Sequence, residues 1–162
     1  MKYSLYILSI TLLFSCNANK EETVTQNSAT IDSTVAATGT PETPVLIWRA
    51  TPEYEKVKTA GSGDTLPLDS LIKGLNDNYP NVKLEKLKQS HDTLYTLIKD
   101  SEYLTQRMGS TGAEIYVADV ILNLTTVPGV QYVNIEFEEG DHAGPGTWSK
   151  ENFSKFKEKK SD

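Results

Sequence analysis

The stretch TGAEIYVADVILNLTTVPGVQYVNIEFE, residues 111–138, decides the expected fold because it joins the longest helical pattern of the chain to an alternating strand pattern. Its first four residues have the Thr-x-x-Glu spacing of a capping box, so a helix is expected to start at Thr111. That helix continues to about Thr126 and ends before the Pro-Gly pair. Residues 131–138 then alternate and predict a strand, whose inward-facing side chains are Val133, Ile135 and Phe137.

The predicted helix has two different stripes of side chains. One stripe is apolar and is expected to pack on a sheet, because its members recur at helical spacing. It consists of Ala113, Val117, Val120, Ile121 and Leu124. The opposite stripe is mixed and consists of Gly112, Tyr116, Asp119, Asn123 and Thr126.

A second helix is expected over residues 67–78, where five apolar side chains share one helical face. They are Leu68, Leu71, Ile72, Leu75 and Tyr79. Short runs of strand-forming residues predict strands over residues 45–50, 82–87 and 93–99, and the last two form a hairpin across a polar turn. The strand over 93–99 is apolar on both faces, so it is expected to be central or covered.

The remaining segments complete the expected architecture. Residues 54–63 predict a loop or irregular edge, and residues 101–109 a connector. Ser149 is placed to cap a last short helix that carries Phe153 and Phe156, before a solvated tail. The order β-α-β-β-α-β predicts an α+β fold, a small mixed β-sheet with two helices packed on one face.

The first fifteen residues resemble a lipoprotein signal peptide. Lys2 precedes an apolar run of about ten residues, which is too short to span a bilayer. Residues 13–16, Leu-Phe-Ser-Cys, resemble a lipobox, so Cys16 is expected to be lipidated and to become the first residue of the mature chain. The alternative is an ordinary signal peptide that happens to contain a cysteine.

Residues 16–44 follow as an expected disordered tether, because they contain no aromatic residue and few large aliphatic ones. The single domain is therefore expected over residues 45–162. The predicted location is the cell envelope, held to the outer membrane by acyl chains. Residues 20–22, Lys-Glu-Glu, resemble a surface-export signal of Bacteroidota-type lipoproteins, which leaves surface exposure and an inward-facing location both open.

Composition excludes several classes of function. The net charge of the 162-residue chain is -6, which disfavours nucleic acid as a partner. Cys16 is the single cysteine, so neither an intrachain disulfide nor a thiolate metal cluster is possible. His91 and His142 lie about fifty residues apart without metal-ligand spacing, so no metal and no cofactor are expected.

The loop over residues 140–146, Gly-Asp-His-Ala-Gly-Pro-Gly, is the most unusual segment. Three glycines and a proline predict a tight loop of defined shape, and a tryptophan follows it. A fixed loop beside an aromatic side chain is a candidate contact surface, although a simple connecting turn is the competing interpretation. The candidate interaction surface consists of Asp141, His142, Pro145, Trp148 and Tyr132.

The segment from Leu68 to Phe153 resembles a GerMN-type domain, named for a spore-germination and sporulation protein. The resemblance rests on four groups of residues: Tyr103, Leu104 and Thr105; Gly112, Ala113 and Glu114; residues 120–125, Val-Ile-Leu-Asn-Leu-Thr; and Pro128, Gly129 and Val130 with Val133. It implies a non-catalytic envelope domain that acts by protein contact, similar in arrangement to ring-building modules of secretion and sporulation machines.

Three functions therefore stay open from the sequence. The first is a non-catalytic interaction or assembly module that binds an envelope protein. The second is binding of a glycan or small ligand through Trp148, Tyr132 and the glycine-rich loop. The third is a hydrolase that uses Asp141, His142 and the neighbouring glutamates, although Glu136 and Glu138 are expected on the solvent face of their strand.

Overall fold

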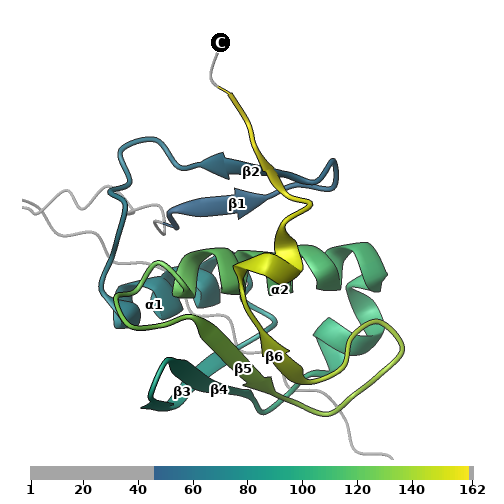
Figure 1. The fold of residues 1–162 in the computed structure, drawn as a ribbon. Helices are drawn as coiled ribbons and strands as arrows, with labels where there is room; N and C mark the ends of the chain where they lie inside the picture. The colour runs from purple at the N-terminus through teal and green to yellow at the C-terminus, as the bar shows by residue number, and fades with distance from the viewer. Residues whose placement is uncertain (1–45, 161–162) are drawn as a thin grey trace, which may run out of the picture. The chain divides into compact units, whose positions relative to one another are not determined.

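The computed structural model describes residues 46–160, and the predicted signal peptide, Cys16 and the predicted tether lie outside this range. Two helices pack against two small mixed β-sheets (Figure 1), which confirms the α+β class. The strands are divided between two sheets, whereas the sequence predicted one.

The larger sheet has the strand order β3-β4-β5-β6. These strands are Leu84–Ser90, Thr93–Ile98, Tyr132–Glu136 and Gly146–Trp148. β4 and β5 are parallel in the centre, while β3 and β6 pair antiparallel at the two edges. The central place of β4 confirms what its two apolar faces predicted.

The smaller sheet has the order β1-β2-β7, from strands Trp48–Ala50, Glu55–Lys58 and Lys157–Glu158. β2 is antiparallel to β1 and parallel to β7. The predictions of a loop over 54–63 and of a solvated tail after residue 156 are therefore wrong in part. Backbone pairing on both sides makes β2 a strand although Val57 is its one apolar residue, and β1 pairs with it instead of joining the larger sheet.

The helices α1 (Leu68–Asn78) and α2 (Gly109–Leu124) form the layer between the two sheets (Figure 1). α2 contacts β1 on one side and β5 on the other. Its apolar stripe is buried as predicted. Three residues of the mixed stripe are also buried. Asp119 and Asn123 are covered by the segment of β1, and Tyr116 packs against the ring of Tyr79, which follows α1.

α2 begins differently from the prediction. A π-helical turn, Tyr103–Arg107, precedes it, and its N-cap residue Met108 makes no side-chain capping bond. The expected capping box from Thr111 to Glu114 is therefore wrong. Gly109 has a φ of +72°, a conformation that glycine adopts without steric cost, so the chain changes direction there and α2 starts two residues earlier.

The C-terminal segment crosses α2 through a short 3-10 helix, Lys150–Phe153. Ser149 and Asn152 form a reciprocal capping box at its start, which confirms the predicted cap, although the helix ends at Phe153 and Phe156 lies beyond it. Phe153 and Phe156 are 7% and 3% exposed, so they anchor the segment in the core. The chain then continues directly into β7.

Asn123 on α2 fixes the free edge of β1 with its side-chain amide. Its Oδ1 accepts hydrogen bonds from the backbone N–H groups of Ile47 and Trp48, at 2.7 and 3.0 Å. Its Nδ2 donates to the carbonyls of Trp48 and Asp119, at 2.9 and 2.7 Å. An edge that would otherwise be open to another strand is therefore closed by the helix.

Asp119, one turn earlier, extends this network. Its Oδ1 accepts from the Ala50 N–H at 2.6 Å, and its Oδ2 accepts from the Tyr79 hydroxyl at 2.6 Å and lies 3.3 Å from Arg49 Nε. Burial raises the pKa of Asp119 to about 6, although the hydrogen bonds from Tyr79 and Ala50 and the charge of Arg49 act in the opposite direction. Burial also raises the pKa of Tyr116, whose ring packs edge-on to that of Tyr79.

Candidate functional site

The predicted glycine-rich loop is pinned to the π-helical turn and to the start of α2. The His142 N–H donates to the Thr105 carbonyl at 3.0 Å, and its Nδ1 lies 3.2 Å from the Ser110 hydroxyl. A Cβ on Gly140 would lie 2.7 Å from the Thr105 Cβ, so only glycine permits this approach. The loop therefore has the defined shape that its composition predicted.

His142 and Trp148 line one hollow of about 310 Å³, which we call the loop hollow. α2 supplies one wall and the 3-10 helix another. The polar side chains at its rim already have partners: Glu114 pairs with Lys155, and Asn152 accepts from the Ser149 N–H. The lining residues are Ala113, Glu114, Val117, His142, Ala143, Gly144, Trp148, Asn152 and Phe153.

The Trp148 indole is held in place by a glycine two residues earlier. Trp148 pairs with Val133, which is fully buried, so both side chains face the helical layer. A Cβ on Gly146 would lie 2.9 Å from Cζ2 of the indole. The ring thus packs across the Gly146 backbone and forms part of the wall of the loop hollow.

Gly146→Ala is expected to push the Trp148 ring out of this position and to lower the free energy of unfolding by about 1–2 kcal/mol, a usual cost of overpacking. Fluorescence in a Trp48→Phe background, where Trp148 is the remaining tryptophan, measures the displacement. Gly63→Ala is the control, because its nearest neighbour would be 3.5 Å away. An unchanged emission spectrum in Gly146→Ala would contradict the packing described.

The structure separates Tyr132 from the rest of the predicted surface. Tyr132 starts β5 and is 42% exposed, whereas the neighbouring Val133 is buried, so alternation places Tyr132 on the outer face of the larger sheet. Trp148 lies on the inner face. Asp141 and Pro145 are exposed in the loop and do not line the loop hollow. Of the five predicted residues, the hollow therefore unites His142 and Trp148.

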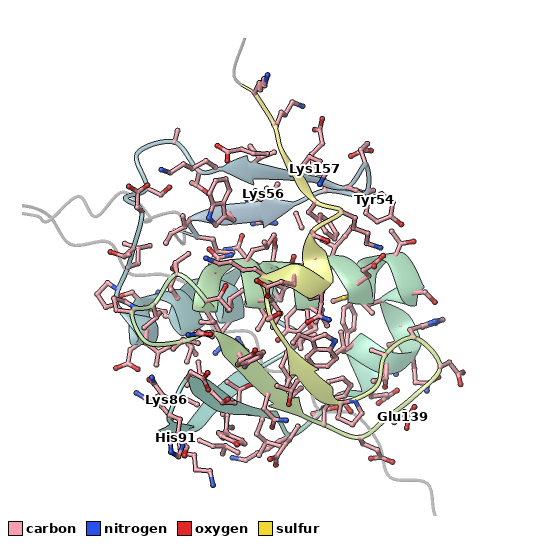
Figure 2. All side chains as sticks on the ribbon, viewed as in Figure 1. Tyr54, Lys56, Lys86, His91, Glu139 and Lys157 are labelled. Atoms are coloured by element: carbon pink, nitrogen blue, oxygen red, sulfur yellow. The ribbon has the colours of Figure 1, made fainter. Side chains whose placement is uncertain are left out.

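The two histidines lie at opposite ends of the larger sheet. His91 occupies the β3–β4 turn, next to the start of β5, where Asp92 O accepts from the Tyr132 N–H at 3.0 Å. His142 follows the other end of β5, and Figure 2 shows Glu139, just before the loop, far across the sheet from His91. His91 and His142 therefore do not form the pair of neighbouring histidines that would support the hydrolase interpretation.

Residues 46–160 were also searched for metal-binding groups and for membrane-spanning helices, and neither was found. No group of three His, Cys, Asp or Glu side chains in this range is arranged to hold a metal ion. Neither described helix has the length and apolarity needed to cross a membrane. Glu136 is exposed on the outer face of β5, as its position in the alternation predicted.

Sequence reasoning missed the α2 and 3-10 helix residues of the loop hollow. Phe153 was expected in a short helix, but nothing in its spacing indicated that this helix would cross α2 beside Trp148. Asp119 and Asn123 were also missed as structural residues. The sequence did contain a sign of this structural role, because Asp119 and Asn123 are two polar side chains at i, i+4 spacing within an otherwise apolar helical run.

The chain was compared with models of protein families, with curated proteins and with solved structures. None of the three comparisons gives a match. The resemblance to GerMN-type domains stays a prediction.

Proposed function

We propose that the chain is a lipid-anchored envelope protein whose domain is a non-catalytic interaction or assembly module. The observation that carries this proposal is the loop hollow, where a pinned loop holds His142 beside a half-buried Trp148. A rigid aromatic at the wall of a hollow is the type of residue that dominates binding energy at protein interfaces.

The chemistry of the loop hollow suits a single anchoring side chain of a partner protein. Its walls combine apolar groups of Val117 and Phe153 with the ring of Trp148. The charged and polar groups stand at the rim, where Glu114 is already neutralised by Lys155. The partner is therefore expected to insert an apolar or aromatic side chain, while its polar groups contact His142.

The experiment is crosslinking of the intact protein in its native cells, followed by purification and mass spectrometry. We expect a small, reproducible set of envelope proteins that is lost in the double variant His142→Ala, Trp148→Ala. The matched control is His91→Ala with Tyr132→Ala, which likewise removes one histidine and one aromatic side chain, at the other end of β5. Equal capture by both double variants would count against the loop hollow as the contact site.

The lipid anchor is tested separately through Cys16. Cys16→Ser is expected to abolish incorporation of a labelled fatty acid and to release the protein from the membrane fraction, because the acyl chains supply the membrane affinity. Persistent labelling in Cys16→Ser would refute the proposed anchor without bearing on the loop hollow.

A further inference from the structure

The two sheets of the domain have four edges, and three of these edges are closed or cut short. The edge of β1 is bonded to α2, as described above. On the edge of β3, the carboxamide of Asn76 donates to the Leu84 carbonyl at 3.0 Å and accepts from the Leu84 N–H at 2.7 Å, and a bulge between Lys86 and Lys88 interrupts the register. The edge strand β6 has three residues and begins directly after Pro145, which lacks an N–H group. The remaining edge is that of β7.

The backbone groups of the β7 segment point alternately to β2 and to the free edge. The N–H groups of Lys157 and Lys159 donate to carbonyls of the β2 segment, at 2.9 and 3.0 Å. Because successive N–H and C=O groups of a strand point to opposite sides, those of Glu158 and Lys160 point to the free edge. Both residues are exposed, and this part of the chain lies on the side of the smaller sheet turned away from α1 and α2 (Figure 1). A row of outward-facing backbone groups is a template for another strand.

The charges of the β7 segment determine which strand fits this edge. An antiparallel second copy that is centred on Lys159 sets Glu158 opposite Lys160 of the other chain, and the two-fold axis repeats this pair. Both residues point their backbone groups to the edge, so each pair also exchanges N–H···O=C hydrogen bonds. The two Lys159 side chains then meet, but each already pairs with Glu55 of its own chain, at 3.3 Å.

Other registers and other strands fit this edge less well. A centre at Glu158 or at Lys160 sets that residue opposite its own copy, so like charges meet at the hydrogen-bonded positions. A shift by one residue sets outward-facing backbone groups opposite inward-facing ones, so the hydrogen bonds are lost. An unrelated strand meets an edge rich in lysine, which opposes strand addition. The edge therefore favours an antiparallel copy of itself.

We propose that β7 pairs with β7 of a second copy of this chain, antiparallel and centred on Lys159, so that the two smaller sheets become one continuous sheet. The contact consists of a few backbone hydrogen bonds and one repeated ion pair, which is too small for stable association in dilute solution. The pairing therefore rests on the lipid anchor of the proposed function, which confines both copies to one membrane and raises their effective concentration. No residue of β7 lines the loop hollow, so the pairing does not occupy it.

The test is a cysteine scan of the full chain in membranes isolated from its native cells. Lys159→Cys, Glu158→Cys and Lys160→Cys each introduce one thiol, while Cys16, the single native cysteine, is expected to be acylated. In the proposed pair the two Cα atoms at position 159 lie about 4.5 Å apart, within disulfide range, whereas those at 158 or at 160 are diagonal neighbours about 7–8 Å apart. Mild oxidation is therefore expected to link Lys159→Cys into dimers at least about fivefold faster than either neighbouring variant.

Two controls accompany the scan. Thr147→Cys places an exposed thiol on the edge of β6, and it is expected to form dimers no faster than Glu158→Cys. The chain without an introduced cysteine measures any linkage through Cys16.

Charge reversal in the Lys159→Cys background tests the ion pairs. Glu158→Lys sets like charges opposite each other in both pairs, and so does Lys160→Glu, so each variant alone is expected to form dimers about tenfold more slowly. Co-expression of the two variants restores unlike charges in both pairs. Linkage between the two kinds of chain, distinguished by a size tag on one, is then expected to return to within about twofold of the starting rate. Local damage to β7 by either substitution would not be repaired by co-expression.

The pairing would be refuted by equal rates across the scan, by a maximum at Glu158→Cys or Lys160→Cys, by comparable linkage in Thr147→Cys, or by no gain on co-expression. Failure of the anchor is measured separately, because Cys16→Ser would then leave the location of the chain unchanged, whatever the scan shows. Chains that are anchored through Cys16 but give equal rates across the scan would refute the pairing alone.

Discussion

Asn123→Ala is expected to lower the free energy of unfolding by about 3–5 kcal/mol, more than a usual single substitution. The side-chain amide of Asn123 satisfies the backbone N–H groups of Ile47 and Trp48 and the carbonyls of Trp48 and Asp119. Alanine leaves the two N–H groups and the Trp48 carbonyl without this partner, whereas the Asp119 carbonyl keeps its helical bond within α2. Each unsatisfied buried group costs about 1–3 kcal/mol. β1 is then expected to detach from α2.

Urea unfolding of the full chain measures this effect. Asn81→Ala is the matched control, because Asn81 is exposed, and its free energy of unfolding is expected to change by less than about 0.5 kcal/mol. Hydrogen exchange adds a local reading, since the Ile47 and Trp48 amides should lose protection in Asn123→Ala before those of β4 do. A loss below about 1 kcal/mol would show that the smaller sheet does not depend on Asn123.

Asp119 is expected to make the protein less stable as the pH rises from about 4 to about 7. Its native pKa is about 6, above the ordinary value of 3.8, chiefly because the carboxylate is buried. Between these two values the native state holds a proton that the unfolded state releases, so this contribution to stability is complete below about pH 4 and is lost as the pH passes 6. A rise of about two pKa units corresponds to about 3 kcal/mol.

The measurement is the difference in unfolding free energy between the wild type and Asp119→Asn from about pH 4 to about pH 7. Asparagine does not titrate, so the difference should move by about 3 kcal/mol in favour of the variant as the pH rises. Asp64→Asn is the control: Asp64 is exposed, and the hydrogen bond and charge of Lys58 lower its pKa, so its effect on the slope has the opposite sign. Parallel pH curves for wild type and Asp119→Asn would refute the assignment.

Three strands of the larger sheet and both helices could be predicted, because the periodicity of their side chains reflects which face is buried. The fourth strand, β6, was not predicted, because it begins at the last residue of the glycine-rich loop. Leu71 and Leu75 mark the buried face of α1, and the alternation of Leu94, Thr96 and Ile98 marks the inner face of β4. β2 could not be predicted in this way. Its residues, Glu-Lys-Val-Lys, form a strand through backbone pairing on both sides, and backbone pairing leaves little trace in the choice of side chains.

The second sheet and the second face of α2 were missed for one common reason. Tyr116, Asp119 and Asn123 resemble a solvent-facing stripe, because two of the three are strongly polar. The partners of Asp119 and Asn123 are backbone groups near and in β1 and the hydroxyl of Tyr79, and Tyr116 packs edge-on to the Tyr79 ring. Periodicity does not reveal such partners. The same limit applies to the candidate site, where the loop sequence indicated His142 and Trp148 but not the helices that enclose them.

The position of β1 also determines how the protein responds to force. The described chain enters the domain immediately before β1, so a pull transmitted from the preceding residues reaches this strand first. β1 is bonded to β2 along one edge and to the side chains of Asn123 and Asp119 along the other. Tension along the strand axis loads the hydrogen bonds on both edges of β1 at the same time, in shear. Tension across the strand would break these hydrogen bonds one after another. The mechanical resistance of the domain is therefore expected to depend on the direction of the pull and on two side chains of α2, Asn123 and Asp119.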